Sequence, residues 1–187
     1  MEAVAAPGPA EDEPRVARRA IVFVGFMGAG KSTAARAVAA ELGVEPLDLD
    51  RELERELGQT IESFFASEGE DAFRAREEEL ALRLLSREDV RVAALGGGAL
   101  GSNRIREALS EHVVVHLDVE ADDAWRRASG RGRPLARDRG RFDQLHQQRR
   151  ADYERTADAL LPAADRGVAG RALPSLLALR DAPPGTR

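Results

Sequence analysis

GFMGAGKS at positions 25–32 fits the pattern G-x-x-x-x-G-K-[ST] at every specified position. An apolar run at residues 20–24 precedes it directly, and a helix-forming run, STAARAVAAEL, begins at Ser32. Such a strand, glycine-rich turn and helix surround phosphate oxygens with backbone N–H groups and the positive end of a helix dipole. The stretch therefore predicts a nucleotide-binding P-loop rather than an ordinary glycine-rich turn.

The residues of this loop divide the work of holding a nucleotide. Lys31 is the only lysine among the 28 basic residues, and its ammonium would reach the β and γ phosphates. The Ser32 hydroxyl would serve Mg²⁺, the metal expected to accompany ATP. If the motif were only a turn, Lys31 would be a solvated surface charge. The expected ATP contacts in the loop are Gly28, Ala29, Gly30, Lys31, Ser32 and Thr33.

Composition excludes several classes of protein. The chain has 187 residues, a net charge of -5 and no cysteine. Disulfides, thiolate chemistry and Cys-ligated zinc are therefore ruled out, and the acidic balance argues against a general nucleic-acid binder. No apolar run approaches the ~20 residues of a membrane span, and the N-terminus lacks a secretory signal. We expect a cytoplasmic monomer without nucleic-acid or membrane partners.

Apolar runs alternate with amphipathic charged stretches along most of the chain. Near-continuous runs such as IVFV and VVVHL are typical of buried parallel strands, and the helices between them would cover both faces of a sheet. We expect one α/β domain over residues 19–180, a three-layer α/β/α sandwich around a mostly five-stranded parallel sheet. Residues 1–18 and 181–187 lack hydrophobic periodicity, so we expect disordered ends there.

The charged middle of the chain divides at turn signals. We expect helices over residues 51–57, 60–66 and 69–86, the second opened by an imperfect capping box at Thr60. The apolar stripe of the third helix would consist of Phe73, Leu80 and Leu84.

Residues 131–141, RGRPLARDRGR, form an arginine-rich segment with two glycines, a proline and no apolar period. Like charges at this density repel each other, and we expect no helix to brace them. The segment therefore predicts a mobile lid over about residues 130–141, which becomes ordered when triphosphate and acceptor are both bound. Its arginines are Arg131, Arg133, Arg137, Arg139 and Arg141.

The single lysine also narrows the kind of P-loop protein. The guanine-specific N-K-x-D element of a GTPase requires a second lysine, and the chain is too short for most motor or transporter ATPases. A kinase acting on a small molecule remains.

Such a kinase needs carboxylates beside its phosphate loop, and PLDLD at residues 46–50 supplies two. Alternation along a strand places Asp48 and Asp50 on one face of the strand end. One carboxylate would hold the water shell of the metal, while the other orients or deprotonates an acceptor hydroxyl. Asp118 ends the run VVVHLD without such a partner, and we expect it to cap the helix at residues 120–127.

Several motifs in a fixed order resemble the shikimate kinase family over residues 20–164. They are GFMGAGKST, LDLD, IESFFASEGEDAFRARE, the GGGA run, the RPL segment and RRADY. The resemblance implies a nucleoside-monophosphate-kinase-like fold and transfer of the ATP γ-phosphate to the 3-hydroxyl of shikimate. It thereby implies ATP and shikimate as substrates, Mg²⁺ as cofactor and a place in aromatic amino-acid biosynthesis.

The resemblance also implies roles around the transferring phosphate. Ser32 and Asp48 would lie at the metal, and Asp50 at the shikimate hydroxyls. Arg133, in the lid, would reach over the phosphate as it moves. The catalytic residues would be Lys31, Asp50 and Arg133.

On the acceptor side, Arg74 and Arg149 would clamp the shikimate carboxylate, a ligand suited to the planar guanidinium fork. Arg150 stands next to Arg149, and either could face the site. Glu77 lies one helical turn from Arg74 and can hold that arginine in place. The backbone platform under the ring would be formed by Gly96, Gly97 and Gly98.

The roles of some other side chains are less specific. Phe65 and Phe73 would be either part of the wall of the acceptor site or ordinary core. Arg126 and Arg166 are further candidates for contacts with ATP. No metal-ligand spacing and no chemistry are assigned to His112, His116 and His146.

Two alternative functions remain open. One is a kinase of the same fold for another polyol acid such as gluconate, against which the two clamping arginines and the triple glycine argue. The other is a non-catalytic nucleotide-binding module, against which Asp48, Asp50 and Arg133 argue.

Overall fold

The computed structural model of the chain describes residues 19–129, 134–165 and 167–182. Its centre is a parallel sheet with the strand order β2-β3-β1-β4-β5. The strands are β1 (Ile21–Val24), β2 (Leu47–Asp48), β3 (Val92–Ala94), β4 (Val113–Asp118) and β5 (Ala159–Pro162). β1 is the middle strand and is buried along its whole length, as its continuous apolar sequence requires. The expected five-stranded parallel sheet is confirmed.

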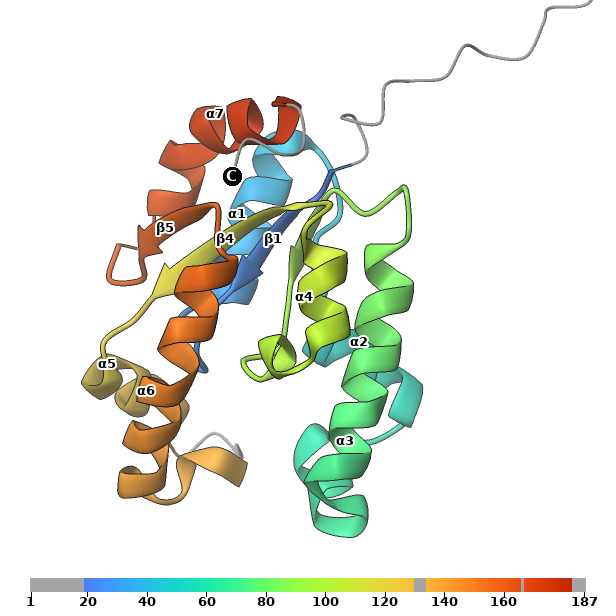
Figure 1. Cartoon of the computed structure of the whole chain (residues 1–187), viewed down its shortest axis with the longest axis vertical. Helices are drawn as coiled ribbons and strands as arrows, with labels where there is room; N and C mark the ends of the chain where they lie inside the picture. The colour runs from blue at the N-terminus through green and yellow to red at the C-terminus, as the bar shows by residue number, and fades with distance from the viewer. Residues whose placement is uncertain (1–18, 130–133, 166, 183–187) are drawn as a thin grey trace, which may run out of the picture.

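Helices cover both faces of this sheet. They are α1 (Lys31–Leu42), α2 (Leu49–Leu57), α3 (Ile61–Leu85), α4 (Asn103–Leu109), α5 (Ala121–Ala128), α6 (Arg139–Thr156) and α7 (Val168–Asp181), with short 3₁₀ helices η2 (Ala99–Gly101) and η3 (Pro134–Ala136). α1 and α7 pack together on one face, whereas α3, α4 and α6 lie on the other (Figure 1). The three layers are those expected for an α/β/α sandwich.

The parallel register brings the carboxyl ends of the strands to one edge of the sheet. Val24 lies opposite His116 on β4, and Asp48 lies opposite Ala94 on β3. The segments that follow these strands therefore meet at the same edge, where open α/β sheets bind ligands. The glycine-rich stretch at residues 25–32 follows β1 and is one of them.

Helix α3 combines two helices that the sequence predicts separately. The Thr60 hydroxyl accepts a hydrogen bond from the backbone N–H of residue 63 at 3.2 Å, which confirms the expected cap. Gly69 interrupts the helix with φ 83° and ψ 176°, a conformation that a residue with a side chain would adopt only under strain. The expected apolar stripe is buried and consists of Phe73, Leu80 and Leu84.

The expectation of an unstructured loop over residues 131–141 is wrong at its carboxyl end. Residues 134–136 form η3, and α6 already begins at Arg139. Asp138 caps this helix, because its Oδ1 accepts from the backbone N–H of Arg141 at 2.7 Å. Arg131 and Arg133 lie outside the described residues, so the expected lid movement stays a prediction.

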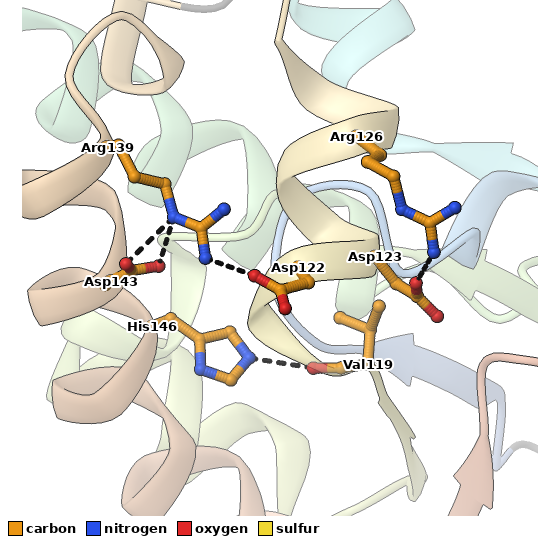
Figure 2. Close-up of polar contacts among 7 residues, drawn as sticks. All are labelled: Val119, Asp122, Asp123, Arg126, Arg139, Asp143 and His146. Carbon is orange, nitrogen blue, oxygen red and sulfur yellow. Dashed lines mark hydrogen bonds and ion pairs between the residues drawn. The ribbon is translucent and has the colours of Figure 1, made fainter.

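Charge pairing explains why an arginine-rich segment can begin a helix. Arg139 donates from Nε to both carboxylate oxygens of Asp143, at 2.9 and 2.8 Å, and from Nη2 to Asp122 on α5 (Figure 2). Its guanidinium also lies 5.6 Å from the centre of the Trp125 ring. The repulsion expected among these arginines is therefore offset by acidic partners, one on the next turn of the same helix and one on α5.

The two ends of the described chain meet at α7. Arg19 donates from Nη1 to the carbonyl oxygens of Leu179 and Ala182, each at 3.0 Å. The helix runs through Asp181, one residue beyond the domain boundary expected at residue 180. The expected disordered ends, residues 1–18 and most of 181–187, lie outside the described residues. Among the helices described, none is both long enough and apolar enough to cross a membrane.

Candidate active site

The phosphate loop has the backbone geometry of an anion cradle. Gly28 has φ 84°, and a Cβ at this position would lie 2.8 Å from the carbonyl oxygen of Ala124 on α5. Only glycine therefore fits both the turn and the close packing. The loop leads directly into α1, whose first residues line the same cavity as the loop, so the positive end of the helix dipole lies beside that space.

This loop lines a cavity of about 400 Å³. The Lys31 side chain is buried and turns back over the loop, donating from Nζ to the carbonyl oxygens of Gly25 at 2.9 Å and Phe26 at 3.1 Å. An ammonium held at this point stands beside any phosphate that enters the cradle. The predicted ATP contacts that line the cavity are Gly28, Ala29, Gly30, Lys31, Ser32 and Thr33.

Asp48 and Asp50 reach the cavity by a different route from the one expected. Strand β2 ends at Asp48, and α2 begins at Leu49, so the two carboxylates do not share the face of a strand. Asp48 is the N-cap of α2 and accepts from the N–H of Arg51 at 3.4 Å, whereas Asp50 lies in the first turn. The capping preference of aspartate ends the strand early, yet both residues line the same cavity.

The donors beside the loop suit Mg²⁺ more than a transition metal. Ser32 and Asp48 both line the cavity and offer hydroxyl and carboxylate oxygens. In the part of the chain that the structure describes, no three His, Cys, Asp or Glu side chains come together as a metal cluster. A hard cation that keeps several waters and takes its other ligands from phosphate fits such a sparse set.

A second cavity, of about 360 Å³, adjoins the first. Asp50 lines both cavities, so this residue lies where they meet. The predicted acceptor residues that line the second cavity are Asp50, Phe65, Phe73, Arg74, Gly97, Gly98 and Arg149.

Arg74 is held at this cavity by acidic side chains of its own helix. Its Nη1 donates to Glu77 Oε2 at 2.5 Å and its Nη2 to Glu70 Oε1 at 3.2 Å. Burial raises the pKa of Glu77, Arg74 acts against that rise, and the neighbouring Asp50 carboxylate adds to it. The guanidinium also covers Gly98, where an added Cβ would collide with it.

Of the two adjacent arginines on α6, Arg149 faces the cavity. It donates from Nη1 to the carbonyl oxygen of Gly97 at 2.9 Å. Arg150 is paired with Glu154 at 2.9 Å and with Asp118 at 3.2 Å. The expected capping role of Asp118 is wrong, because this residue ends β4 and binds Arg150, and no side chain caps α5.

The arginines of α5 differ from expectation as well. Arg126 is 74% exposed and is paired with Asp123 (Figure 2), so it points away from the nucleotide cavity. Arg127 lines that cavity and donates to the carbonyl oxygens of Gly28 at 3.3 Å and Ala163 at 3.4 Å. Sequence reasoning missed Arg127, although its place three residues after the buried Ala124 marks the inward face of the helix.

The remaining predicted residues occupy other places. Phe65 and Phe73 pack with ring centres 4.5 Å apart, and Phe73 belongs both to the core and to the wall of the second cavity. Gly96 lies behind the cavity, where a Cβ would meet Glu77 and Asp50. Arg133 and Arg166 lie outside the described residues.

Each histidine has a packing role in the fold. His112 accepts from the N–H of Ala20 at 3.2 Å, and His146 contacts the carbonyl oxygen of Val119 at 2.8 Å (Figure 2). The ring of His146 also packs edge-on against Phe26 of the phosphate loop, with centres 5.0 Å apart. His116 lies 5.1 Å from the ring of Tyr153.

Known proteins resemble this chain over most of its length. A family model described as "Shikimate kinase" matches residues 27–173. A shikimate kinase from Thermobifida fusca (strain YX) is 42% identical over 139 residues, which cover 73% of this chain and 80% of that protein. A solved shikimate kinase from Acinetobacter baumannii, in complex with shikimate, has a TM-score of 0.78 and 35% identity and covers 86% of this chain and 92% of that one. A gluconokinase from Sinorhizobium meliloti 1021, with a TM-score of 0.51 and 18% identity over 88% and 94% of the two chains, shares the fold alone.

Proposed function

The chain belongs to the shikimate kinase family, and we propose that its two cavities hold ATP and shikimate side by side, so that the γ-phosphate passes to the 3-hydroxyl of shikimate. The enzyme is an ATP-dependent small-molecule kinase, and its product in this proposal is shikimate 3-phosphate.

The position of Asp50 is the observation that carries this proposal. Asp50 lines both the phosphate-loop cavity and the cavity with Arg74 and Arg149. A residue at that junction can touch the acceptor hydroxyl and still lie near the phosphate that the hydroxyl attacks. Holding both reactants at one point converts a two-body encounter into a local step, which is a large part of the catalysis of phosphoryl transfer.

The acceptor cavity favours a small molecule that carries both a carboxylate and hydroxyl groups. Arg74 and Arg149 offer two guanidinium groups at its wall, and forked N–H donors match a carboxylate better than a hydroxyl. Asp50 lines the same cavity, and its carboxylate can accept hydrogen bonds from hydroxyl groups. Shikimate meets both requirements.

In the reaction, the acceptor oxygen forms a bond to the γ-phosphorus, and the bond from that phosphorus to the β–γ bridging oxygen breaks. Asp50 orients the hydroxyl and receives its proton. Lys31 leaves the loop carbonyl groups and neutralises charge on the β and γ phosphates, while the loop N–H groups hold the β-phosphate. Arg127 stands beside the loop at Gly28 and adds positive charge to the nucleotide cavity. Arg133 over the phosphate remains a prediction from the family resemblance.

Ser32 and Asp48 are the residues that would hold Mg²⁺, Ser32 through its hydroxyl and Asp48 through the water shell of the ion. The metal would supply charge neutralisation at the phosphate oxygens. Asp48 can serve in this way because its cap to Arg51 is a long hydrogen bond of 3.4 Å, which leaves carboxylate oxygen capacity for a second partner.

The test is a coupled assay of ADP release with shikimate, with gluconate and with no acceptor. We expect turnover that depends on shikimate, and ³¹P and ¹H NMR of the product should place the phosphate on the 3-oxygen. Turnover with gluconate but not with shikimate would support the polyol-acid alternative. Binding of nucleotide without turnover on either acceptor would support a non-catalytic module. Arg74→Lys is the matched variant: it keeps the charge and loses the fork, so the KM for shikimate should rise while the KM for ATP stays unchanged.

A further inference from the structure

Tyr153 is a buried side chain to which the proposed reaction gives no role. It lies on α6, one helical turn after Arg149, and its side chain is almost fully enclosed, with the residue 3% exposed. Its hydroxyl donates a 2.6 Å hydrogen bond to the carbonyl oxygen of Gly97. The same oxygen accepts from Arg149 at 2.9 Å, so two donors from one face of α6 converge on a single peptide group.

That peptide belongs to the wall of the acceptor cavity, and its surroundings leave it little freedom. Gly97 packs on the phosphate loop, where an added Cβ would lie 3.1 Å from the backbone nitrogen of Met27. Gly98 lies under the guanidinium of Arg74. Both glycines line the acceptor cavity and also a neighbouring cavity, which Tyr153 lines with them. Tyr153 therefore acts on the platform through the Gly97 carbonyl oxygen and is not among the residues that line the acceptor cavity itself.

The hydrogen bond fixes more than one atom. In a trans peptide the C=O and the following N–H point in opposite directions, and the described residues contain no cis peptide bond. Holding the Gly97 oxygen against α6 thus also fixes the direction of the Gly98 N–H. The orientation of the platform is then set before an acceptor arrives, which lowers the ordering cost of binding.

The dual use of Arg149 is a second reason why the Tyr153 hydroxyl is needed at Gly97. This arginine is bound to Gly97 and is also one of the two guanidinium groups offered to the acceptor carboxylate. When the carboxylate draws Arg149 toward itself, the Gly97 oxygen would lose that donor. A partly buried carbonyl oxygen that loses its partners is destabilised, and the tyrosine hydroxyl reduces this cost because it remains bound.

We propose that Tyr153 is a positioning residue for the acceptor, which keeps the Gly97–Gly98 peptide in its binding orientation and leaves Arg149 free to turn to the carboxylate. The inference rests on the proposed function. Burial raises the pKa of the Tyr153 phenol, so the hydroxyl stays protonated and remains a donor at neutral pH. His116 supports the ring from β4, with ring centres 5.1 Å apart and planes inclined at 31°.

Tyr153→Phe tests the inference because it removes only the hydroxyl. The matched control is Thr156→Val on the same helix, which removes another buried hydroxyl whose 2.8 Å hydrogen bond goes to the carbonyl oxygen of Asp152 within α6. We expect the KM for shikimate to rise about tenfold in Tyr153→Phe, the size that follows from the loss of about one hydrogen bond. The KM for ATP should stay within about twofold of wild type, and Thr156→Val should change neither value.

A purely structural role would give a different result. In that case both variants would lower the unfolding temperature and the active fraction, and the two KM values of Tyr153→Phe would stay as in wild type; that result would overturn the inference. An equal rise in both KM values would overturn it as well. Hydrogen exchange over residues 96–101 gives a second readout that does not depend on turnover, and we expect faster exchange there in Tyr153→Phe only. The proposed function is tested separately, by turnover of the wild-type enzyme with shikimate. The positioning role of Tyr153 is tested by the ratio of the variant KM to the wild-type KM.

Discussion

Glu77 holds Arg74 through a 2.5 Å hydrogen bond across one turn of α3, with the Glu77 side chain 3% exposed and the Arg74 side chain 28% exposed. Glu77 is thus buried, whereas Arg74 is partly exposed at the wall of the acceptor cavity. A buried carboxylate of this kind restricts where the guanidinium can point. The pair therefore converts a flexible surface arginine into a fixed anion receptor.

Glu77→Gln should weaken binding of the acceptor. The amide keeps the shape of the side chain but removes the charge that orients Arg74, so we expect the KM for shikimate to rise about tenfold. The KM for ATP should be unchanged. Steady-state kinetics with each substrate varied in turn measures both values.

Glu79→Gln is the control, because Glu79 also pairs with an arginine on α3 but is about 61% exposed with its partner Arg76 about 60% exposed. An exposed pair of this kind contributes little. If Glu77→Gln and Glu79→Gln behave alike, Glu77 does not position Arg74.

The relation between Glu77 and Arg74 was within reach of the sequence, since residues three apart on a helix are neighbours. The sheet and the phosphate loop were equally accessible, because apolar runs and a strand-glycine-helix pattern are local signals. What the sequence does not contain is the burial of Glu77. That depends on Gly96, which follows β3 and whose missing side chain leaves room for the carboxylate.

Arg127→Ala and Arg126→Ala should differ sharply in their effect on ATP. Arg127 reaches the carbonyl oxygen of Gly28 and lines the nucleotide cavity, whereas Arg126 is paired with Asp123 on the outside of α5. We expect the KM for ATP to rise about tenfold for Arg127→Ala and less than twofold for Arg126→Ala. The KM for shikimate should stay unchanged in both. A larger effect from Arg126→Ala would reverse the assignment made from the geometry.

The choice between neighbouring residues is where sequence reasoning reaches its limit. Adjacent residues on a helix point about 100° apart, so only one of Arg126 and Arg127 can face inward, and the choice depends on how α5 packs on the loop. The same holds for Arg149 and Arg150: the hydrogen bond to the Gly97 carbonyl oxygen identifies Arg149 as the one that faces the cavity. The sequence around Asp48 fits both a strand and a helix N-cap. The structure shows the cap, because Asp48 accepts a hydrogen bond from the backbone N–H of Arg51.

Lys31→Ala should abolish turnover without removing the fold. The ammonium is the only lysine charge in the chain, and it stands over the phosphate loop at Gly25 and Phe26. Loss of a preorganised charge that acts on the transferring phosphate should lower kcat by roughly 10³-fold or more. A far-ultraviolet circular dichroism spectrum like that of wild type would show that the fold is intact. Turnover within tenfold of wild type would contradict the role of this lysine.

His116 predicts how stability depends on pH. Burial lowers its pKa from the ordinary value of 6.5, with the Asp118 and Glu154 carboxylates acting against this and the Arg150 and Lys31 cations adding to it. The native state therefore keeps His116 neutral at a pH where the unfolded chain already takes up a proton, so its contribution to stability is complete above about pH 6.5 and is lost as the pH falls below that value.

Urea unfolding of wild type and of His116→Gln at several pH values measures this contribution of His116 to stability. The free energy of unfolding of wild type minus that of the variant should decrease between pH 7.5 and pH 5.5. Subtraction removes the contributions common to both proteins, among them His112, whose pKa burial also lowers, and Glu77, whose raised pKa acts in the opposite sense. A difference that stays constant over this range would mean that His116 titrates alike in the folded and unfolded chains, and that the ring behind Tyr153 can carry a charge without cost to the fold.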